Sequence, residues 1–537
     1  MCIKLGQALR QIYNSNKFPW IIICVGIGLR LVRYLHNTPL WFDESVYAVD
    51  IINRSITDFI HPSSEFLQVQ ALGFYIYEKF AVNIFGTSEY AFRLAPFLFS
   101  IISLFLFYKI AKHFTNTRAA CIALTLFAIL DPLIYYSTEL KPYSGDVVFT
   151  LLILSLATYK GEELNVQRIF MLTVVGAIVI LLSNPSVFVL GGVWAGLLLS
   201  CLKRREWAKC RGLLIVSIIW ALIFLAVYFT YYRIMIVAMS EHVSLEKAFE
   251  MEQFIMPFPP RSLVDVKWLI DFFFDTFLFQ DSIMYVKRVT LSGLMAFAFL
   301  VGSVSMFLDK REKFYILLFP ILLTLLAAAM HQYPFKGRQI LFLVPMFLII
   351  ISEGAEYIRS RINEKSVIIG AVFMGLLFIY PASWAAYHVK KPLIRSEIKQ
   401  VLSYIKQNWQ EGDFVYLHFF TQYEFEYYTQ YHPAPYKFDK NEYVIGIGPR
   451  GWYDKWRRNK LPERYRNIDD QSRYDLIKEY MHDLDQMKGR KRVWILFGGD
   501  ITMENFFLSH LDSIGKRHDS FGKAGLGMTY LYDLSLD

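Results

Sequence analysis

Two adjacent carboxylates, Asp43 and Glu44, follow the aromatic pair Trp41-Phe42 just after the first long apolar segment. Charges placed this close to a membrane are costly unless they have a partner or a function. A carboxylate can act as a general base that takes a proton from a hydroxyl, and it can also bind a divalent metal ion. A structural interpretation is equally open, because acidic residues are favourable in the first turn of a helix.

A set of basic residues lies at the same ends of the apolar segments as this acidic pair. Lysine and arginine normally collect on the cytoplasmic side of a membrane protein, and the topology derived below places these residues on the other side. Each one alone could reach an ordinary lipid phosphate, but as a set they favour a site for a phosphate or pyrophosphate group. The set comprises Arg30, Arg33, Arg93, Lys141, Lys336 and Arg338.

A third polar patch runs from Tyr135 to Tyr143, with Asp146 shortly after it. Its charged residues Glu139 and Lys141 fall at the same membrane face, where a simple ion pair between them is the alternative to a functional role. The histidines are scattered without the spacing of a zinc site, so no metal ligand can be assigned. The histidines considered were His61, His331 and His418.

The composition tells what kind of protein must position these residues. Of 537 residues, 55% are hydrophobic and 19% are charged, against roughly 45–50% and 25% in soluble domains. The mean hydropathy is +0.33, which excludes a disordered chain, a collagen-like fibre and a disulfide miniprotein. The net charge of +9 comes without a basic stripe interleaved with aromatics, so nucleic acid is not expected as a partner. None of the five cysteines has metal-ligand spacing.

Runs of about 20 apolar residues predict transmembrane helices, and the chain contains about eleven. The first run ends in arginines rather than small residues, so it is expected to remain as an anchor. The approximate spans are 18–36, 90–112, 118–137, 144–159, 167–183, 185–203, 211–234, 287–308, 313–331, 338–357 and 366–387.

Basic clusters in alternate loops place those loops in the cytoplasm. The outer side then receives loop 37–89, which carries the acidic motif and is expected to form interfacial helices, the aromatic loop 235–286, and everything after residue 389. The predicted fold class is thus a polytopic α-helical membrane protein with a small C-terminal α/β domain. Its domains are a transmembrane module over 1–389 and an extracytoplasmic domain over 390–537.

The C-terminal segment alternates between helical and strand patterns, which favours an α/β domain. Helices are expected at 393–408, 421–430 and near 471–487. Strands are expected at 414–417 and 492–497, in a short run from 443, and in a closing strand through 530–532.

These patches together make the chain resemble the C-type integral membrane glycosyltransferases. It is most similar to bacterial members of glycosyltransferase family 39 that are related to protein O-mannosyltransferases and to the lipid A aminoarabinose transferase. The matching segments follow the family order within roughly residues 20–350. They are 41–44, 85–94, 136–143 and 333–345.

The resemblance implies a transfer of a sugar from a polyprenyl phosphate to a hydroxyl of a lipid, glycan or protein, on the outer face of the cytoplasmic membrane and with inversion. It implies Asp43 as the catalytic carboxylate, assisted by Glu44. Donor phosphate contacts are expected from Arg93, Lys336, Arg338, Lys141 and Arg33, and further substrate contacts from Glu139, Tyr143 and Tyr333. No cofactor is assigned, and a divalent metal ion stays open.

The chain departs from the family where many members have a His-Pro-Pro stretch, since His61-Pro62 is followed here by two serines. This leaves any metal role of that loop open, and the C-terminal segment has no repeats that would imply a protein acceptor. The alternatives are a transporter or flippase of lipid-linked sugar, which would need charges at mid-membrane, and a glycan-binding scaffold. A scaffold should tolerate Asp43→Asn, whereas a transferase should lose turnover.

Overall fold

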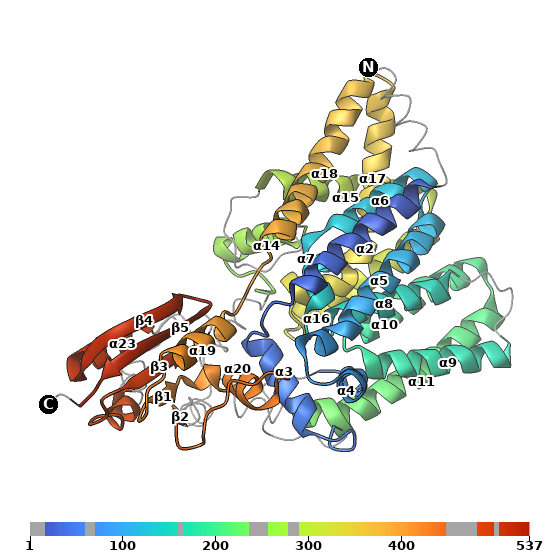
Figure 1. Cartoon of the computed structure of the whole chain (residues 1–537). Coiled ribbons are helices and arrows are strands. Elements are labelled where there is room, and N and C mark those ends of the chain that lie inside the picture. Colours follow the sequence, from blue (N-terminus) through green and yellow to red (C-terminus); the bar gives the residue numbers. More distant parts are fainter. Residues whose placement is uncertain are drawn as a thin grey trace.

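The structure is a computed structural model, and it describes residues 17–59, 70–158, 165–235, 256–277, 289–446, 481–498 and 504–535. The predictions that concern His61, part of the loop 235–286 and most of the helix near 471–487 lie outside these residues. Figure 1 shows a helical bundle with a small sheet domain beside its lower end, at the end opposite to the N-terminus.

Seven helical segments in the described part of the chain are long and apolar enough to cross a membrane. Six of them are α2 (Phe18–His36), α5 (Glu89–Phe114), α10 (Ser186–Arg204), α11 (Trp207–Val227), α16 (Arg311–Ala329) and α18 (Val367–Lys390). The helix α11 continues through the π-helical turn η2 (Tyr228–Tyr232). In the seventh segment, the 3₁₀ turn η3 (Gly337–Leu343) leads into α17 (Val344–Asn363).

Four further apolar segments complete the set of eleven predicted spans. One is bent by 57° between α6 (Thr117–Ile129) and the pair α7 (Asp131–Tyr135) and η1 (Tyr136–Thr138), where Pro132 cannot continue the preceding hydrogen bonds. The other three are the shorter helices α8 (Tyr143–Ala157), α9 (Val166–Leu182) and α15 (Val289–Asp309). The predicted polytopic fold is confirmed.

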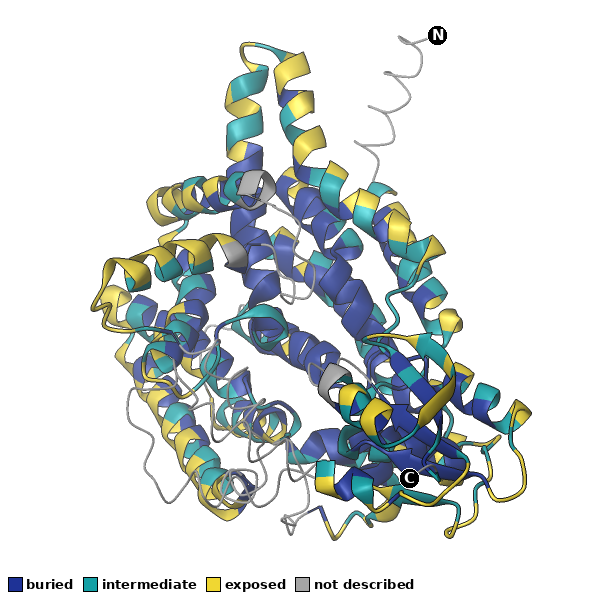
Figure 2. Ribbon diagram, turned by 90° about the vertical axis from the view of Figure 1, so that its left-hand side faces the viewer, coloured by how far each residue is buried: buried dark blue, intermediate teal, exposed yellow. Residues whose placement is uncertain are grey.

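Burial varies strongly among these helices. In α17, 94% of the apolar window is buried, whereas in α18 the share is only 17%. Figure 2 shows this contrast, with dark blue helices inside the bundle and yellow faces at its periphery. An apolar helix that leaves most of its surface uncovered is suited to lipid rather than water, so α17 is the central helix and α18 faces the bilayer.

The first outer loop folds into two short helices, α3 (Phe42–Asn53) and α4 (Leu72–Phe85). Both are largely buried against their neighbours, and Figure 1 places them beside the sheet domain. Part of the second outer loop forms the amphipathic helix α14 (Leu263–Thr276). The acidic pair is therefore held on a packed helix.

The C-terminal part contains a five-stranded sheet of order β2-β1-β3-β5-β4. The strands β1 (Phe414–Leu417), β2 (Tyr443–Ile445) and β3 (Val493–Phe497) are parallel, and β5 (Gly527–Asp533) and β4 (Lys516–Lys523) are added antiparallel. The helices around it are α19 (Ile398–Gln407), α20 (Gln422–Glu426), which continues into η5 (Tyr427–Tyr431), and α23 (Glu504–Ile514). The sequence did not predict β4 or α23.

One hydrophobic cluster joins the outer helices to this domain. Leu40, Tyr47 and Phe74 of the first outer loop pack in the same buried cluster as Ile398 and Tyr427. The α/β domain and the helix that carries the acidic pair therefore share a core.

Candidate active site

Asp43 lies in the first turn of α3, where its carboxylate receives two cations from other elements. Its Oδ2 is 3.3 Å from Lys141 Nζ and 3.4 Å from a terminal nitrogen of Arg338. Lys141 comes from the turn before α8, and Arg338 comes from η3, at the start of the segment that continues as α17. Asp43 and Lys141 are buried, and Arg338 is 27% exposed.

Lys141 is further held by aromatic rings. Its Nζ lies 4.5 Å from the centre of the Tyr47 ring and 5.8 Å from that of Trp41, distances at which a cation is attracted by the face of a ring. On the other side, the Arg338 guanidinium lies 6.0 Å from the Tyr143 ring. Lys336 is half-buried two residues before Arg338. The predicted cations Lys141 and Arg338 thus meet at Asp43, with aromatic rings beside both of them.

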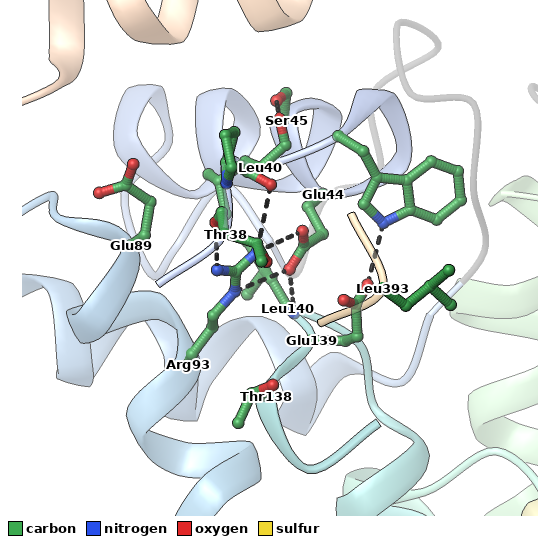
Figure 3. Close-up of polar contacts among 12 residues, drawn as sticks. Thr38, Leu40, Glu44, Ser45, Glu89, Arg93, Thr138, Glu139, Leu140 and Leu393 are labelled. Atoms are coloured by element: carbon green, nitrogen blue, oxygen red, sulfur yellow. Dashed lines mark hydrogen bonds and ion pairs between the residues drawn. The ribbon is translucent and has the colours of Figure 1, made fainter. Parts of the chain in front are cut away.

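Glu44, the second member of the acidic pair, has a different environment. Arg93 of α5 binds it with two nitrogens, at 2.7 Å and 3.2 Å, and the backbone N–H of Leu140 donates to it at 2.8 Å. Figure 3 shows this arrangement, in which Arg93 also reaches the carbonyl oxygen of Thr38. Glu44 therefore ties α3 to α5 and to the turn that carries Lys141.

Glu139 belongs to a second basic group next to the first. Its carboxylate accepts the indole N–H of Trp41 at 2.9 Å and lies 3.7 Å from Arg33. The Arg395 guanidinium lies 4.6 Å from the Trp41 ring and 5.0 Å from the Tyr135 ring. Glu139 thus has Arg33 as an ionic partner, whereas Lys141 lies beside Asp43.

Several predicted residues have roles that their sequence position did not reveal. Arg30 is fully buried and donates to carbonyl oxygens of Gly26, Phe127 and Ala128, so it joins α2 to α6 rather than the cationic pocket. Tyr333 donates its hydroxyl to the carbonyl of Gln339 at 2.9 Å. Arg395 was missed, although it is a basic residue on the outer side and the same rule would have selected it.

The α/β domain covers the acidic pair from the other side. Its helix α20 packs on α3, and its Phe420 ring meets that of Phe42 edge-on, with centroids 5.4 Å apart. Glu424 of α20 is buried, with only 1% of it exposed. Burial raises the pKa of Glu424 to about 8, and the negative charge of Glu44 adds to the shift.

A second contact fixes the domain to the start of α5. Glu89 binds Lys399, accepts the hydroxyl hydrogen of Tyr428 at 3.1 Å and lies 3.2 Å from Nε2 of His432. The hydrogen bond to Glu89 raises the pKa of His432 above its ordinary value. The same Tyr428 hydroxyl accepts the backbone N–H of Leu40 at 2.7 Å, which connects the domain to the approach of α3.

Metal ligation by the acidic pair finds no additional support. Nowhere in the ranges described do three His, Cys, Asp or Glu side chains gather in a way that could hold an ion. Both carboxylates of the pair are instead bound by nitrogen donors.

Comparisons with known proteins agree with this architecture. Residues 71–231 match the family described as dolichyl-phosphate-mannose-protein mannosyltransferase. The crystal structure of ArnT from Cupriavidus metallidurans, bound to undecaprenyl phosphate, has a TM-score of 0.52 at 10% identity, covering 96% of this chain and 98% of that one. The chain has the fold of the C-type membrane glycosyltransferases. The resemblance noted in the sequence is confirmed.

Two structures of the Archaeoglobus fulgidus oligosaccharyltransferase share this glycosyltransferase fold. One is tethered to an acceptor peptide with the NVT sequon and has a TM-score of 0.53 at 12% identity, covering 97% of this chain and 74% of that one. The other, AglB in complex with an inhibitory peptide and a dolichol-phosphate, has a TM-score of 0.50 at 13% identity, covering 97% and 75%. No curated protein sequence matches the chain. The chain is a multi-pass membrane protein, as are other proteins of this fold.

Proposed function

We propose that the protein is an inverting glycosyltransferase that moves a sugar from a polyprenyl-phosphate donor to a hydroxyl of a lipid, glycan or protein. The family match and the solved neighbours support this, since the ArnT structure contains bound undecaprenyl phosphate and the AglB structure contains a dolichol-phosphate. The observation that carries the proposal is the convergence of Lys141 and Arg338 on the carboxylate of Asp43.

This arrangement suits a single displacement. The acceptor hydroxyl oxygen attacks the anomeric carbon and its proton passes to Asp43. The bond between the anomeric carbon and the phosphate oxygen breaks, and the phosphate leaves with the electron pair. Lys141 and Arg338 neutralise the negative charge of the leaving phosphate. As the phosphate draws these cations away, the Asp43 carboxylate becomes more available for the proton.

The other predicted residues assist this centre. We assign Lys336 and Arg33 as additional contacts of the phosphate group, and Glu139 and Tyr143 as substrate contacts beside it. Tyr333 is proposed to line the same region.

Glu44 and Arg93 are proposed as positioning residues. Because the Arg93 guanidinium is engaged by Glu44 and by backbone carbonyls, it has little capacity for a phosphate. Together the two residues hold Asp43 at its place in the first turn of α3.

We propose that the protein lies in the cytoplasmic membrane, with the active site and residues 390–537 on the extracytoplasmic side. The support is the basic clusters of the alternate loops, such as Lys203-Arg204-Arg205 after α10 and Lys310-Arg311 after α15, which the positive-inside rule places in the cytoplasm.

The test uses the purified full chain in proteoliposomes with radiolabelled polyprenyl-phosphate sugars. Wild type should release label from the lipid, and Asp43→Asn should lose turnover by about 10²–10⁴-fold while still binding undecaprenyl phosphate. Glu353→Gln, which alters a carboxylate paired with Lys310, is the control and should keep activity. A sample with EDTA tests the metal question.

Two outcomes would contradict the proposal. Full activity of Asp43→Asn would remove Asp43 from the chemistry. Movement of labelled lipid between the leaflets, without loss of label from any donor, would point to a flippase instead.

A further inference from the structure

Asp146 is a buried carboxylate that the mechanism above does not use. It lies in the first turn of α8, and only 6% of it is exposed. Its Oδ1 accepts a hydrogen bond from the Ser183 hydroxyl at 2.7 Å. No side chain of the described residues donates to Oδ2. An ionisable group inside the apolar part of a membrane protein is expensive and usually has a function.

The unused oxygen keeps access to open space. The buried oxygens that lack both a partner and solvent contact include those of Glu78 but not Oδ2 of Asp146. Glu78 is therefore sealed in the packing and can do no more than remain neutral, whereas Asp146 can receive a ligand.

Hydroxyl-bearing side chains from several elements lie within electrostatic range of Asp146. They are Tyr77 of α4, Tyr232 of η2 and Tyr333 of the turn before η3. Ser183, from the end of α9, adds a fourth hydroxyl. A buried place where a few polar groups converge among aromatic rings is typical of a small-molecule site, and its neutral hydroxyls with one acceptor suit a polyhydroxylated ligand.

The location connects this place to the phosphate pocket. Tyr143, whose ring borders the Arg338 guanidinium, lies one helical turn before Asp146 on α8, and residues three apart share a helix face. The Cα atom of Asp146 thus lies about 4.5 Å further along the axis of α8 than that of Tyr143. A phosphate beside Arg338 would therefore have Asp146 one turn further along the same face of α8.

We propose that Asp146 recognises the sugar of the donor, with its Oδ2 accepting a hydrogen bond from a sugar hydroxyl while Ser183 fixes its Oδ1. This assignment rests on the proposed function, because it takes the sugar to be linked to the phosphate held by Lys141 and Arg338. Asp146 then determines which donors are accepted, and Asp43 performs the chemistry.

The experiment compares the affinity of the purified full chain for undecaprenyl phosphate with that for undecaprenyl phosphate carrying mannose, glucose, galactose or arabinose. The ratio of the two dissociation constants isolates the contribution of the sugar. Wild type should bind at least one sugar-carrying lipid more tightly than the bare lipid. In Asp146→Asn this gain should fall by about 10- to 100-fold, the effect of losing one hydrogen bond to a charged group, while binding of the bare lipid stays unchanged.

Ser183→Ala should reduce the same gain less strongly, and Glu353→Gln should leave it unchanged. The inference is overturned if Asp146→Asn keeps the gain, if it weakens the bare and the sugar-carrying lipid equally, or if no sugar improves binding to wild type. Failure of the proposed function is a separate result. A sugar gain that depends on Asp146 without any transfer would refute the transferase alone, and transfer without this dependence would refute the sugar site alone.

Discussion

Replacing Arg93 by methionine tests whether the Glu44–Arg93 pair holds the catalytic helix. Methionine fills much of the space of the arginine stem but removes the guanidinium, so the fully buried Glu44 carboxylate keeps only the Leu140 N–H. Breaking a buried ion pair by removing one partner costs about 3–5 kcal/mol. The lost bond to the Thr38 carbonyl adds about 1 kcal/mol.

The double variant Arg93→Met/Glu44→Gln separates the pair from other effects of the substitution. It leaves no buried charge, and the Gln oxygen can still accept the Leu140 N–H, so at least half of the lost stability should return. The coupling energy from the double-mutant cycle should be about 2–3 kcal/mol, measured by thermal unfolding in detergent. Transfer activity should fall in Arg93→Met, because the first turn of α3 carries Asp43.

The matched control is the pair of Glu312 and Arg204. It is also bidentate, but its side chains are 44% and 56% exposed. Its coupling should stay below about 1 kcal/mol. A coupling between Glu44 and Arg93 of this same small size would refute the argument that the pair holds α3 in place.

Two further predictions concern the contact between the α/β domain and the bundle. Burial raises the pKa of Glu424 from 4.5 to about 8, so ionising this carboxyl costs free energy in the folded state, and the stability of the fold should decrease between these two pH values. Glu424→Gln should reduce this decrease and raise the melting temperature at pH 8. A pH profile of stability that is the same in Glu424→Gln as in wild type would contradict the prediction. The raised pKa of His432 means that its charged bond to Glu89 stabilises docking at low pH and is lost as the pH rises through that pKa. The protection factors of residues 427–432, measured against the intrinsic exchange rate at each pH, should fall from pH 6 to pH 9 in wild type and much less in His432→Asn.

Each predicted span falls on a helix because the length and apolarity of a membrane segment are properties of the chain alone. The ionic partners of the acidic pair, in contrast, could not be predicted from the sequence. Asp43 and Glu44 are neighbours in sequence, yet one faces Lys141 and the other faces Arg93, 49 residues away. Adjacent side chains of a helix point about 100° apart, and the element that lies in each direction is set by the tertiary packing, which the spacing of residues does not give.

The strand β4 shows why part of the α/β domain was not predicted. Its sequence, Lys516–Lys523, is mostly polar and charged and lies at the edge of the sheet. Such residues are favourable on an edge strand, but they remove the apolar alternation by which strands are recognised. The buried strands β1 and β3 lack this difficulty, and their predicted and observed ranges agree within a residue.

The core shared by the segment 37–89 and the α/β domain also determines when this part of the protein can complete its folding during synthesis. The backbone N–H of Leu40 donates to the hydroxyl of a tyrosine 388 residues later. At about 5–20 residues per second, the ribosome needs roughly 20–80 seconds to supply that partner. During this interval the segment around Asp43 lacks the contacts that the α/β domain provides, so its surroundings are complete only after that domain has been made.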